Sequence, residues 1–219
     1  MENTNPPQKV LRPVVLWKDL YFYQKSDALY QLTVVFCRRF LPKRGDRTVD
    51  QMIQAARSGK QNIIEGSEDG MTSTEMELKL LNVARGSLQE LRADYHDYLQ
   101  ANGLELWKPG HPRYESMRLF CKERNLYDDY KPFVERWTAE EFCNTALTLC
   151  HIVDKLMTAY LEKLAKRFET QGGIKERMYA VRTGYRKQQE EHLRQLEQQC
   201  EAQRKEIERL KALLETRKD

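Results

Sequence analysis

The stretch that decides the fold reads QMIQAARSGKQNIIEG at residues 51–66 and, after a short polar break, TSTEMELKLLNVARGSLQEL at residues 72–91. Apolar residues recur in and just before its first half at steps of three and four: Val49, Met52, Ile53, Ala56 and Ile63. This spacing places them on one face of an α-helix. We expect that helix to end at Gly66, because glycine readily adopts the positive φ that closes many helices.

The second half predicts another helix, with Thr72, Ser73 or Thr74 as its N-cap. Its apolar face consists of Leu78, Leu81, Ala84, Leu88, Leu91, Tyr95 and Tyr98. A link of about six or seven residues predicts that the two helices form an antiparallel hairpin. Small residues on both helices would let the two axes approach closely; they are Ala55, Ala56, Ser58 and Gly59 on the first and Ala84, Gly86 and Ser87 on the second.

The same stretch resembles the signature of a small bacterial family, the four-helix-bundle proteins encoded in intervening sequences of 23S ribosomal RNA genes. The residues that carry the resemblance are Gln51, Ala55, Ala56, Ser58, Asn62, Ile63, Glu65 and Gly66, then Asn82, Ala84, Gly86, Ser87, Leu88, Glu90 and Leu91. The resemblance covers the chain from Leu16 to Lys166. There are two departures: Lys60 stands where the family usually has proline, and Ile53 and Gln54 replace a usually basic pair.

The resemblance has implications for both assembly and partners. Members of this family form rings, often pentamers. The accessory subunit of diversity-generating retroelements belongs to the same family, and it binds a reverse transcriptase and nucleic acid. We therefore expect a homo-oligomer, a pentamer by resemblance, with RNA or DNA and a reverse transcriptase or another protein as candidate partners.

Composition sets further bounds on the protein. Of 219 residues, 40% are hydrophobic and 32% charged, and the net charge of +4 permits nucleic-acid binding without requiring it. Five cysteines without a CxxC pair predict reduced thiols rather than a disulfide framework. The N-terminus is polar, and no apolar run approaches the length of about 18 residues that a membrane span needs. These features predict a cytoplasmic protein that does not enter the membrane.

The remaining signals predict an N-terminal arm at residues 1–15, a four-helix bundle at 16–171 and a basic helix with a coiled-coil tail at 172–219. The first helix is expected to run from Trp17 or Lys18 to Leu41, and the third to stop near Asn102 and Gly103. Thr138 begins a capping box for the fourth helix. Between the third and fourth helices, residues 103–137 form an aromatic-rich insertion, which we expect to pack on the bundle as a lid.

The most basic local stretch lies between the first two predicted helices. From Arg38 to Lys60 there are seven bases against two acids. One interpretation is a solvated corner between helices; the other is a patch that contacts phosphates, with arginines in bidentate contacts and affinity that depends on salt. The candidate nucleic-acid-binding residues are Arg38, Arg39, Lys43, Arg44, Arg47 and Lys60.

The tail has a different pattern. Leu193, Leu196, Cys200, Gln203, Ile207, Leu210 and Leu214 alternate steps of three and four, as in a coiled-coil seam. The candidate oligomerisation residues are Leu193, Leu196, Cys200, Ile207, Leu210 and Leu214; the alternative is a single helix that docks on the bundle. Upstream, Ile174, Met178, Val181 and Tyr185 keep the spacing but join the seam one residue out of phase. Residues 171–187 also hold five bases against one acid.

Signatures of catalysis and of cofactor binding are missing from the sequence. There is no Glu-x-x-His pair of a di-iron bundle, no Walker loop, no GxGxxG and no GxSxG. Cys143 and Cys150 lie seven apart on one helix, a spacing that two ligands of one metal do not easily span. We therefore expect no catalytic residue, no cofactor and no metal, and we interpret these cysteines as core residues.

One enzymatic alternative uses a helical scaffold. HEPN-type ribonucleases carry an arginine followed, four to six residues on, by a histidine, and Arg186 and His192 fit that spacing. These two residues lie in the predicted coiled coil, whereas Arg92 and His96 lie in the bundle but are too close together. The sequence thus predicts an all-α, antiparallel, up-and-down bundle that acts as a non-enzymatic, homo-oligomeric, nucleic-acid-associated scaffold or adaptor. A protein–protein assembly module without nucleic acid is the alternative, and a HEPN-like ribonuclease the third.

Overall fold

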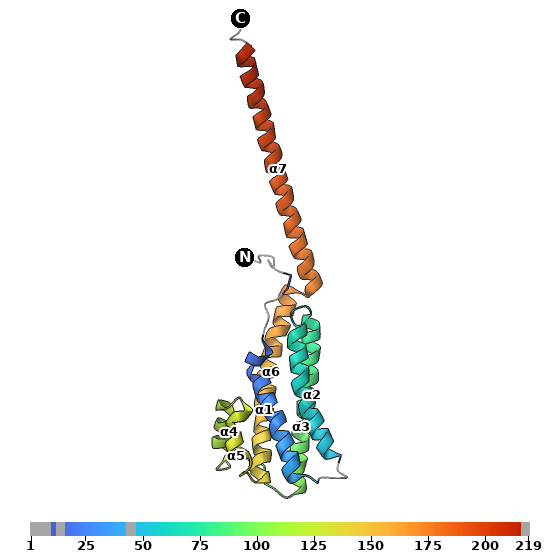
Figure 1. Ribbon diagram of the computed structural model, residues 1–219, viewed down its shortest axis with the longest axis vertical. Coiled ribbons are helices and arrows are strands. Elements are labelled where there is room, and N and C mark those ends of the chain that lie inside the picture. Colours follow the sequence, from blue (N-terminus) through green and yellow to red (C-terminus); the bar gives the residue numbers. More distant parts are fainter. Residues whose placement is uncertain (1–9, 12–15, 43–46, 216–219) are drawn as a thin grey trace. The chain divides into compact units, whose positions relative to one another are not determined.

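The computed structural model describes residues 10–11, 16–42 and 47–215, and all regular elements in these ranges are helical. Four helices pack side by side in the bundle (Figure 1): α1 (Tyr21–Phe40), α2 (Thr48–Asp69), α3 (Thr74–Ala101) and α6 (Ala139–Gln171). Successive helices run in opposite directions, and each packs on its neighbour around the ring α1, α2, α3, α6. The predicted all-α, antiparallel bundle is therefore confirmed.

Aromatic rings fill one part of the bundle core. Phe36 of α1 packs against Tyr95 of α3 and Phe142 of α6, with ring centroids 5.0 and 5.5 Å apart. The buried Tyr95 hydroxyl donates a hydrogen bond to Thr33 Oγ1 at 3.0 Å, which satisfies the one polar atom that this ring brings into the core. Burial raises the pKa of Tyr95 well above its ordinary value.

The α2–α3 hairpin has the close approach that its small residues predict, except at Gly86, which is exposed and has nothing within 4 Å of the position of a Cβ. One expected helix end is also wrong. Gly59 faces the buried Leu88 so closely that a Cβ at Gly59 would lie 2.7 Å from the Leu88 side chain. Gly66 does not end α2; it is buried within the helix, where a Cβ would lie 3.2 Å from Leu80 Cβ. Close packing against α3 therefore explains this glycine better than a positive φ does. The link spans only residues 70–73, and Ser73 accepts the capping hydrogen bond from Met76.

The start of the first helix also differs from the prediction. Trp17–Asp19 form a separate 3₁₀ turn, η1, and Leu20 is extended before α1 begins at Tyr21. At the far end of α3 the predicted stop is confirmed, because Gly103 has a φ of +63° just after Asn102. The predicted arm at residues 1–15 lies outside the described residues except for Val10 and Leu11.

The insertion before α6 contains α4 (Tyr114–Glu123), a 3₁₀ turn η2 (Tyr127–Asp129) and the short α5 (Lys131–Val134). Phe120 packs against Tyr130 and Phe133, with ring centroids 5.6 and 5.2 Å apart. Trp137 connects this aromatic cluster to Phe142 in the bundle core at 5.4 Å. The expected packing of the aromatic insertion on the bundle is confirmed. Thr138 and Glu141 then form the predicted capping box of α6.

After Gly172, whose φ is +65°, the chain continues as the long helix α7 (Ile174–Glu215). Residues 11–173 form one compact unit, and α7 belongs with Val10 to a second unit. Within the described ranges, no helix combines the length and the apolar character that a bilayer crossing requires.

Candidate functional site

The basic corner between α1 and α2 uses two of its predicted phosphate-binding residues for internal contacts. The Arg39 guanidinium donates to the carbonyl oxygens of Val134 and Trp137, the latter at 3.0 Å, and so ties α1 to the end of the insertion. Lys60 Nζ lies 3.1 Å from Asp27 Oδ1 and 4.4 Å from the centre of the Tyr30 ring. Both side chains stabilise packing between elements, which leaves them poorly placed to contact a ligand.

The other members of that predicted set are more exposed. Arg38 lies at the surface, where its Nη2 is 3.3 Å from Glu135 Oε1. Arg47 is exposed just before α2 begins. Lys43 and Arg44 lie outside the described residues. The four of these six bases that the structure describes do not form one free patch, and the assignment of the set to phosphate contacts stays a prediction.

The tail carries exposed apolar side chains on a helix. Leu193, Leu196, Ile207 and Leu210 of α7 keep 44–58% of their surface exposed. Cys200 and Gln203, which lie between them in the predicted seam, are exposed as well, while the Leu214 side chain lies outside what the structure describes. An apolar stripe with this spacing, left in water, is typical of a helix that pairs with another helix.

The first turns of α7 are basic. Lys175, Arg182, Arg186 and Lys187 are exposed along the helix surface. Arg177 differs, because it is buried and its Nε donates to the Val10 carbonyl at 3.2 Å. The exposed bases here make no ion pair within the described parts of the chain. This run of free cations is a feature that the sequence showed only as local charge.

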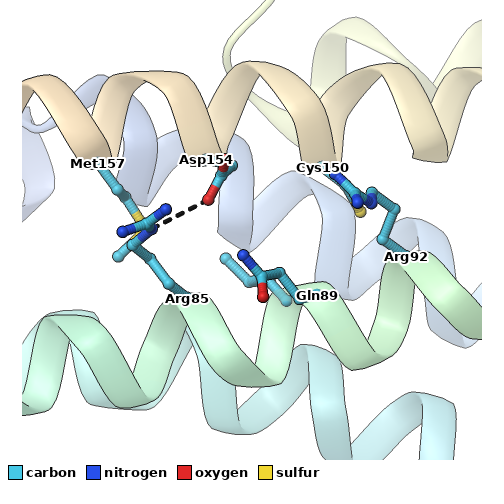
Figure 2. Close-up of a pocket in the computed structure, with 7 residues that line it drawn as sticks. Arg85, Gln89, Arg92, Cys150, Asp154 and Met157 are labelled. Carbon is cyan, nitrogen blue, oxygen red and sulfur yellow. Dashed lines mark hydrogen bonds and ion pairs between the residues drawn. The ribbon is translucent and has the colours of Figure 1, made fainter.

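A small hollow between α3 and α6 is lined by Arg85, Leu88, Gln89, Arg92, Cys150, Asp154 and Met157 (Figure 2). Arg85 Nε and Asp154 Oδ1 form an ion pair across it at 3.0 Å. Its volume of about 10 Å³ is at the lower limit for a single water. This hollow is a packing feature of the α3–α6 contact with no room for a substrate.

A larger open groove of about 630 Å³ runs between α4 and α6. Its apolar lining includes the half-buried side chains of Leu147, Ile152 and Leu156. Its polar lining includes the cations Arg118, Lys122 and Lys155 and the imidazole of His151. The other lining residues are Leu106, Trp107, Tyr114, Asn144, Thr148 and Ala159. Arg118 is paired with Glu115 at 2.9 Å. The groove has the size of a ligand pocket, but its side chains do not form a nucleophile–base pair.

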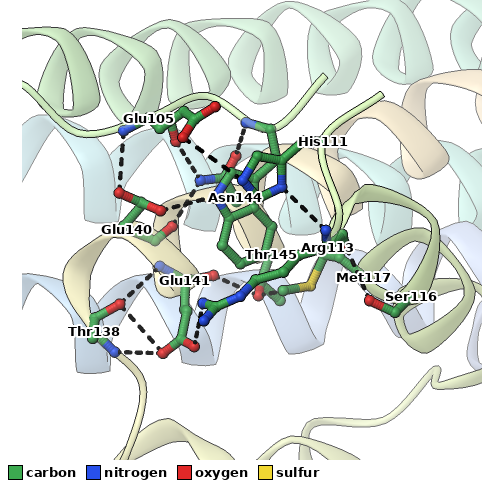
Figure 3. Close-up of polar contacts among 11 residues, drawn as sticks. Glu105, His111, Arg113, Ser116, Met117, Thr138, Glu140, Glu141, Asn144 and Thr145 are labelled. Atoms are coloured by element: carbon green, nitrogen blue, oxygen red, sulfur yellow. Dashed lines mark hydrogen bonds and ion pairs between the residues drawn. The ribbon is translucent and has the colours of Figure 1, made fainter. Parts of the chain in front are cut away.

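A polar network fastens the insertion to the start of α6 (Figure 3). The buried Asn144 accepts from the Trp107 backbone N–H at 2.8 Å and donates to the carbonyls of Glu105 and Glu140 at 2.9 Å each. Glu140 also accepts from Trp107 Nε1 at 2.9 Å. Because each of these groups is satisfied by a partner within the protein, the network reads as a structural clamp.

The cysteines considered as metal ligands lie in the core, whereas the arginine–histidine pair of the ribonuclease alternative lies at the surface. Cys143 and Cys150 are buried in the core, and burial raises the pKa of the Cys150 thiol to about 12. No group of three potential metal ligands occurs in the described ranges. Arg186 and His192 are exposed on α7, on the same helix as the predicted seam.

No protein-family model, curated protein sequence or solved structure matches this chain.

Proposed function

We propose that this chain is a non-enzymatic scaffold or adaptor that assembles through α7 into a parallel coiled coil, with nucleic acid as its partner. The observation that carries the assembly is the exposed apolar seam of α7. Burying the exposed part of a Leu or Ile side chain stabilises a complex by roughly 1 kcal/mol or more, and the seam offers four such residues per chain.

Charge at the seam favours a parallel pair. With Leu193 and Ile207 at heptad position a, Glu206 occupies position g and Lys211 the following position e. In a parallel coiled coil these two positions lie opposite each other on neighbouring chains, so the two side chains attract. Both side chains are exposed in the single chain. Glu206 Oε2 lies 3.9 Å from Arg209 Nη1, which is a long distance for an ion pair.

The family resemblance supports self-association and nucleic-acid binding but suggests a different symmetry. A pentameric ring built by the bundle has fivefold symmetry. A coil of two or three α7 helices has twofold or threefold symmetry, so the two assemblies do not match. We give α7 the leading role because its seam is exposed, whereas the bundle helices already bury their apolar stripes against one another. A reverse transcriptase as protein partner rests on the resemblance alone.

Cys200 provides a direct test of this assembly. It occupies position a, so a parallel, in-register coil would place the two Cys200 thiols beside each other. The other four cysteines are buried, and burial raises the pKa of Cys121 and of Cys150 to about 12, which keeps these thiols unreactive near neutral pH. Mild oxidation of the full chain, or a short bismaleimide, should therefore yield a covalent dimer that Cys200→Ser abolishes.

Light scattering on full-length variants completes the test. We expect a multiple of the 26.0 kDa chain mass for the wild type and the single-chain mass for Leu196→Glu/Leu210→Glu. The matched control is Gln195→Glu/Gln198→Glu, which adds the same charge to α7 away from the seam and should keep the wild-type mass. A wild type that is monomeric, or an assembly that the seam variant does not change, would refute assembly through α7.

A further inference from the structure

Four side chains at the start of α7 lie on one exposed face of the helix. They are Lys175, Tyr179, Arg182 and Arg186, which follow one another at steps of four, three and four residues. All four side chains are exposed, and 73% of the surface of Tyr179 is open to solvent. At helical geometry, this spacing places them along one stripe about 16 Å long. We call these four residues the basic stripe.

The basic stripe and the apolar seam occupy the same face of α7. Counting heptads back from Leu193 at position a places Arg186 and Tyr179 at a, and Arg182 and Lys175 at d. Most a and d positions are apolar downstream, whereas three of the four upstream positions carry cations and the fourth is Tyr179. This relationship appears only when the two segments are continuous in one helix, as α7 shows them to be.

The change of residue type has a physical consequence for a paired α7. In a parallel coil, residues at a and d face their copies on the other chain. Arg182 would then meet Arg182, and Arg186 would meet Arg186, without a carboxylate at these positions to compensate. Like charges that face each other without a partner are destabilising, so the two helices separate upstream of Leu193 and leave their basic stripes opposite each other.

We infer that these two basic stripes form a fork that holds double-stranded DNA through its phosphates. The proposed assembly through α7 is the premise of this inference. Between residues 171 and 187 each chain carries four exposed bases, Lys175, Arg182, Arg186 and Lys187, against one acid, so two chains bring a concentrated positive charge to the fork. Separated helices that continue from a coiled coil have a shape that fits two sides of a DNA duplex.

The choice of duplex DNA follows from the width of a helix. An α-helix with side chains is about 10–12 Å across, and the major groove of B-form DNA is about 12 Å wide. The major groove of A-form RNA is too narrow to admit side chains in this way. The cations of the stripe suit phosphates, which carry no sequence information, so we expect binding that does not depend on DNA sequence.

The experiment is a salt titration of full-length protein with a short, fluorescently labelled DNA duplex of mixed sequence. Three cations per stripe and two chains give about six phosphate contacts, so log K should fall against log salt with a slope of about −5. Arg182→Gln/Arg186→Gln removes four of these contacts per dimer and should reduce the slope by about 3 to 4. The mass of this variant by light scattering should equal that of the wild type.

Two controls separate the fork from general charge. Lys122→Gln/Lys155→Gln removes the same number of charges from the groove between α4 and α6 and should leave the slope unchanged. The seam variant Leu196→Glu/Leu210→Glu should be monomeric and should lose about half of the slope. Equal binding by the wild type and the stripe variant would overturn the inference, as would a loss of binding in the groove control.

The outcomes also distinguish this inference from the proposed assembly. If the wild type crosslinks through Cys200 but does not bind the duplex at low salt, the fork is wrong and the assembly stands. If the monomeric seam variant binds DNA as well as the wild type, a fork of two helices is wrong. Equal or tighter binding to duplex RNA or to single-stranded RNA would overturn the choice of DNA.

Discussion

The ammonium nitrogen of Lys25 in α1 lies 2.6 Å from the carbonyl oxygen of Cys121 near the end of α4. The same nitrogen donates to the carbonyls of Lys122 at 3.2 Å and Arg124 at 2.7 Å. A buried lysine thus satisfies the carbonyl groups that a helix leaves unpaired at its C-terminus, where positive charge is also favoured by the helix dipole. This contact joins the insertion to the first helix of the bundle.

Replacing Lys25 should therefore loosen the insertion. Lys25→Met keeps the length of the side chain but leaves three carbonyls without their charged donor, and we expect a loss of about 1.5–3 kcal/mol in the free energy of unfolding. Urea unfolding measures it. Lys79→Met, which removes an exposed pair with Glu75, should change stability by less than about 0.5 kcal/mol. Equal losses in the two variants would contradict the anchoring role of Lys25.

Two glycines on facing helices should respond to alanine in opposite ways. At Gly59 the new methyl group would lie 2.7 Å from the buried Leu88, so overpacking should destabilise the protein by about 1–3 kcal/mol. At Gly86 nothing lies within 4 Å of the new methyl group, and the better helix propensity of alanine should stabilise by about 0.5–1 kcal/mol. Thermal and urea unfolding of the two variants decide this. The close α2–α3 packing would be in doubt if both changes had the same sign.

The buried thiols should make the protein less stable in alkali. Burial raises the pKa of Cys150 from 9.0 to about 12, so above pH 9 the unfolded chain releases a proton that the folded chain retains. Stability from this group is fully present below pH 9 and is lost as the pH rises toward 12. The expected slope is about −1.4 kcal/mol per pH unit for each such thiol.

Cys150→Ala should remove one such contribution to the slope, and Cys121→Ala another, since the pKa of Cys121 is also raised to about 12. Urea unfolding at several pH values, with reductant present, gives the slopes. Near neutral pH, the free energy of unfolding should depend on pH in the same way for the wild type and the variants. The variants should differ there only by the stability lost with the packing of the thiol. An unchanged alkaline slope in both variants would show that these thiols ionise in the folded protein.

The clamp at the start of α6 should depend on one amide. Asn144→Leu removes the acceptor of the Trp107 N–H and the donor to two carbonyls, at an expected cost of about 1–3 kcal/mol. Hydrogen exchange of the Trp107 amide, followed by NMR, should become faster even under conditions that keep the bundle folded. Asn82→Leu, which replaces an exposed amide on α3, serves as the control. Its free energy of unfolding should stay within about 0.5 kcal/mol of the wild-type value. Unchanged exchange at Trp107 would mean that the amide does not hold the insertion.

Local sequence signals predicted the helices well, because the interactions that produce them are local. The periodicity around Met52 and Leu81, the cap at Ser73 and the capping box at Thr138 each depend on residues within a few positions. The heptads of α7 are a local signal of the same kind. Gly66 shows the limit, since its closeness to Leu80 on another helix, rather than a local turn, explains the glycine.

Only the tertiary structure decided which charged side chains are available to a ligand. By sequence, Lys25, Arg39 and Lys60 look like surface cations, yet each is held by groups 33 to 99 positions away in the chain. Arg182 and Arg186 keep their charges exposed. The sequence by itself determined the helices and their apolar faces, because helical spacing depends on neighbours in the chain. The partners of its cations depended on which helices pack together, since a charged side chain is bound or free according to what lies opposite it in space.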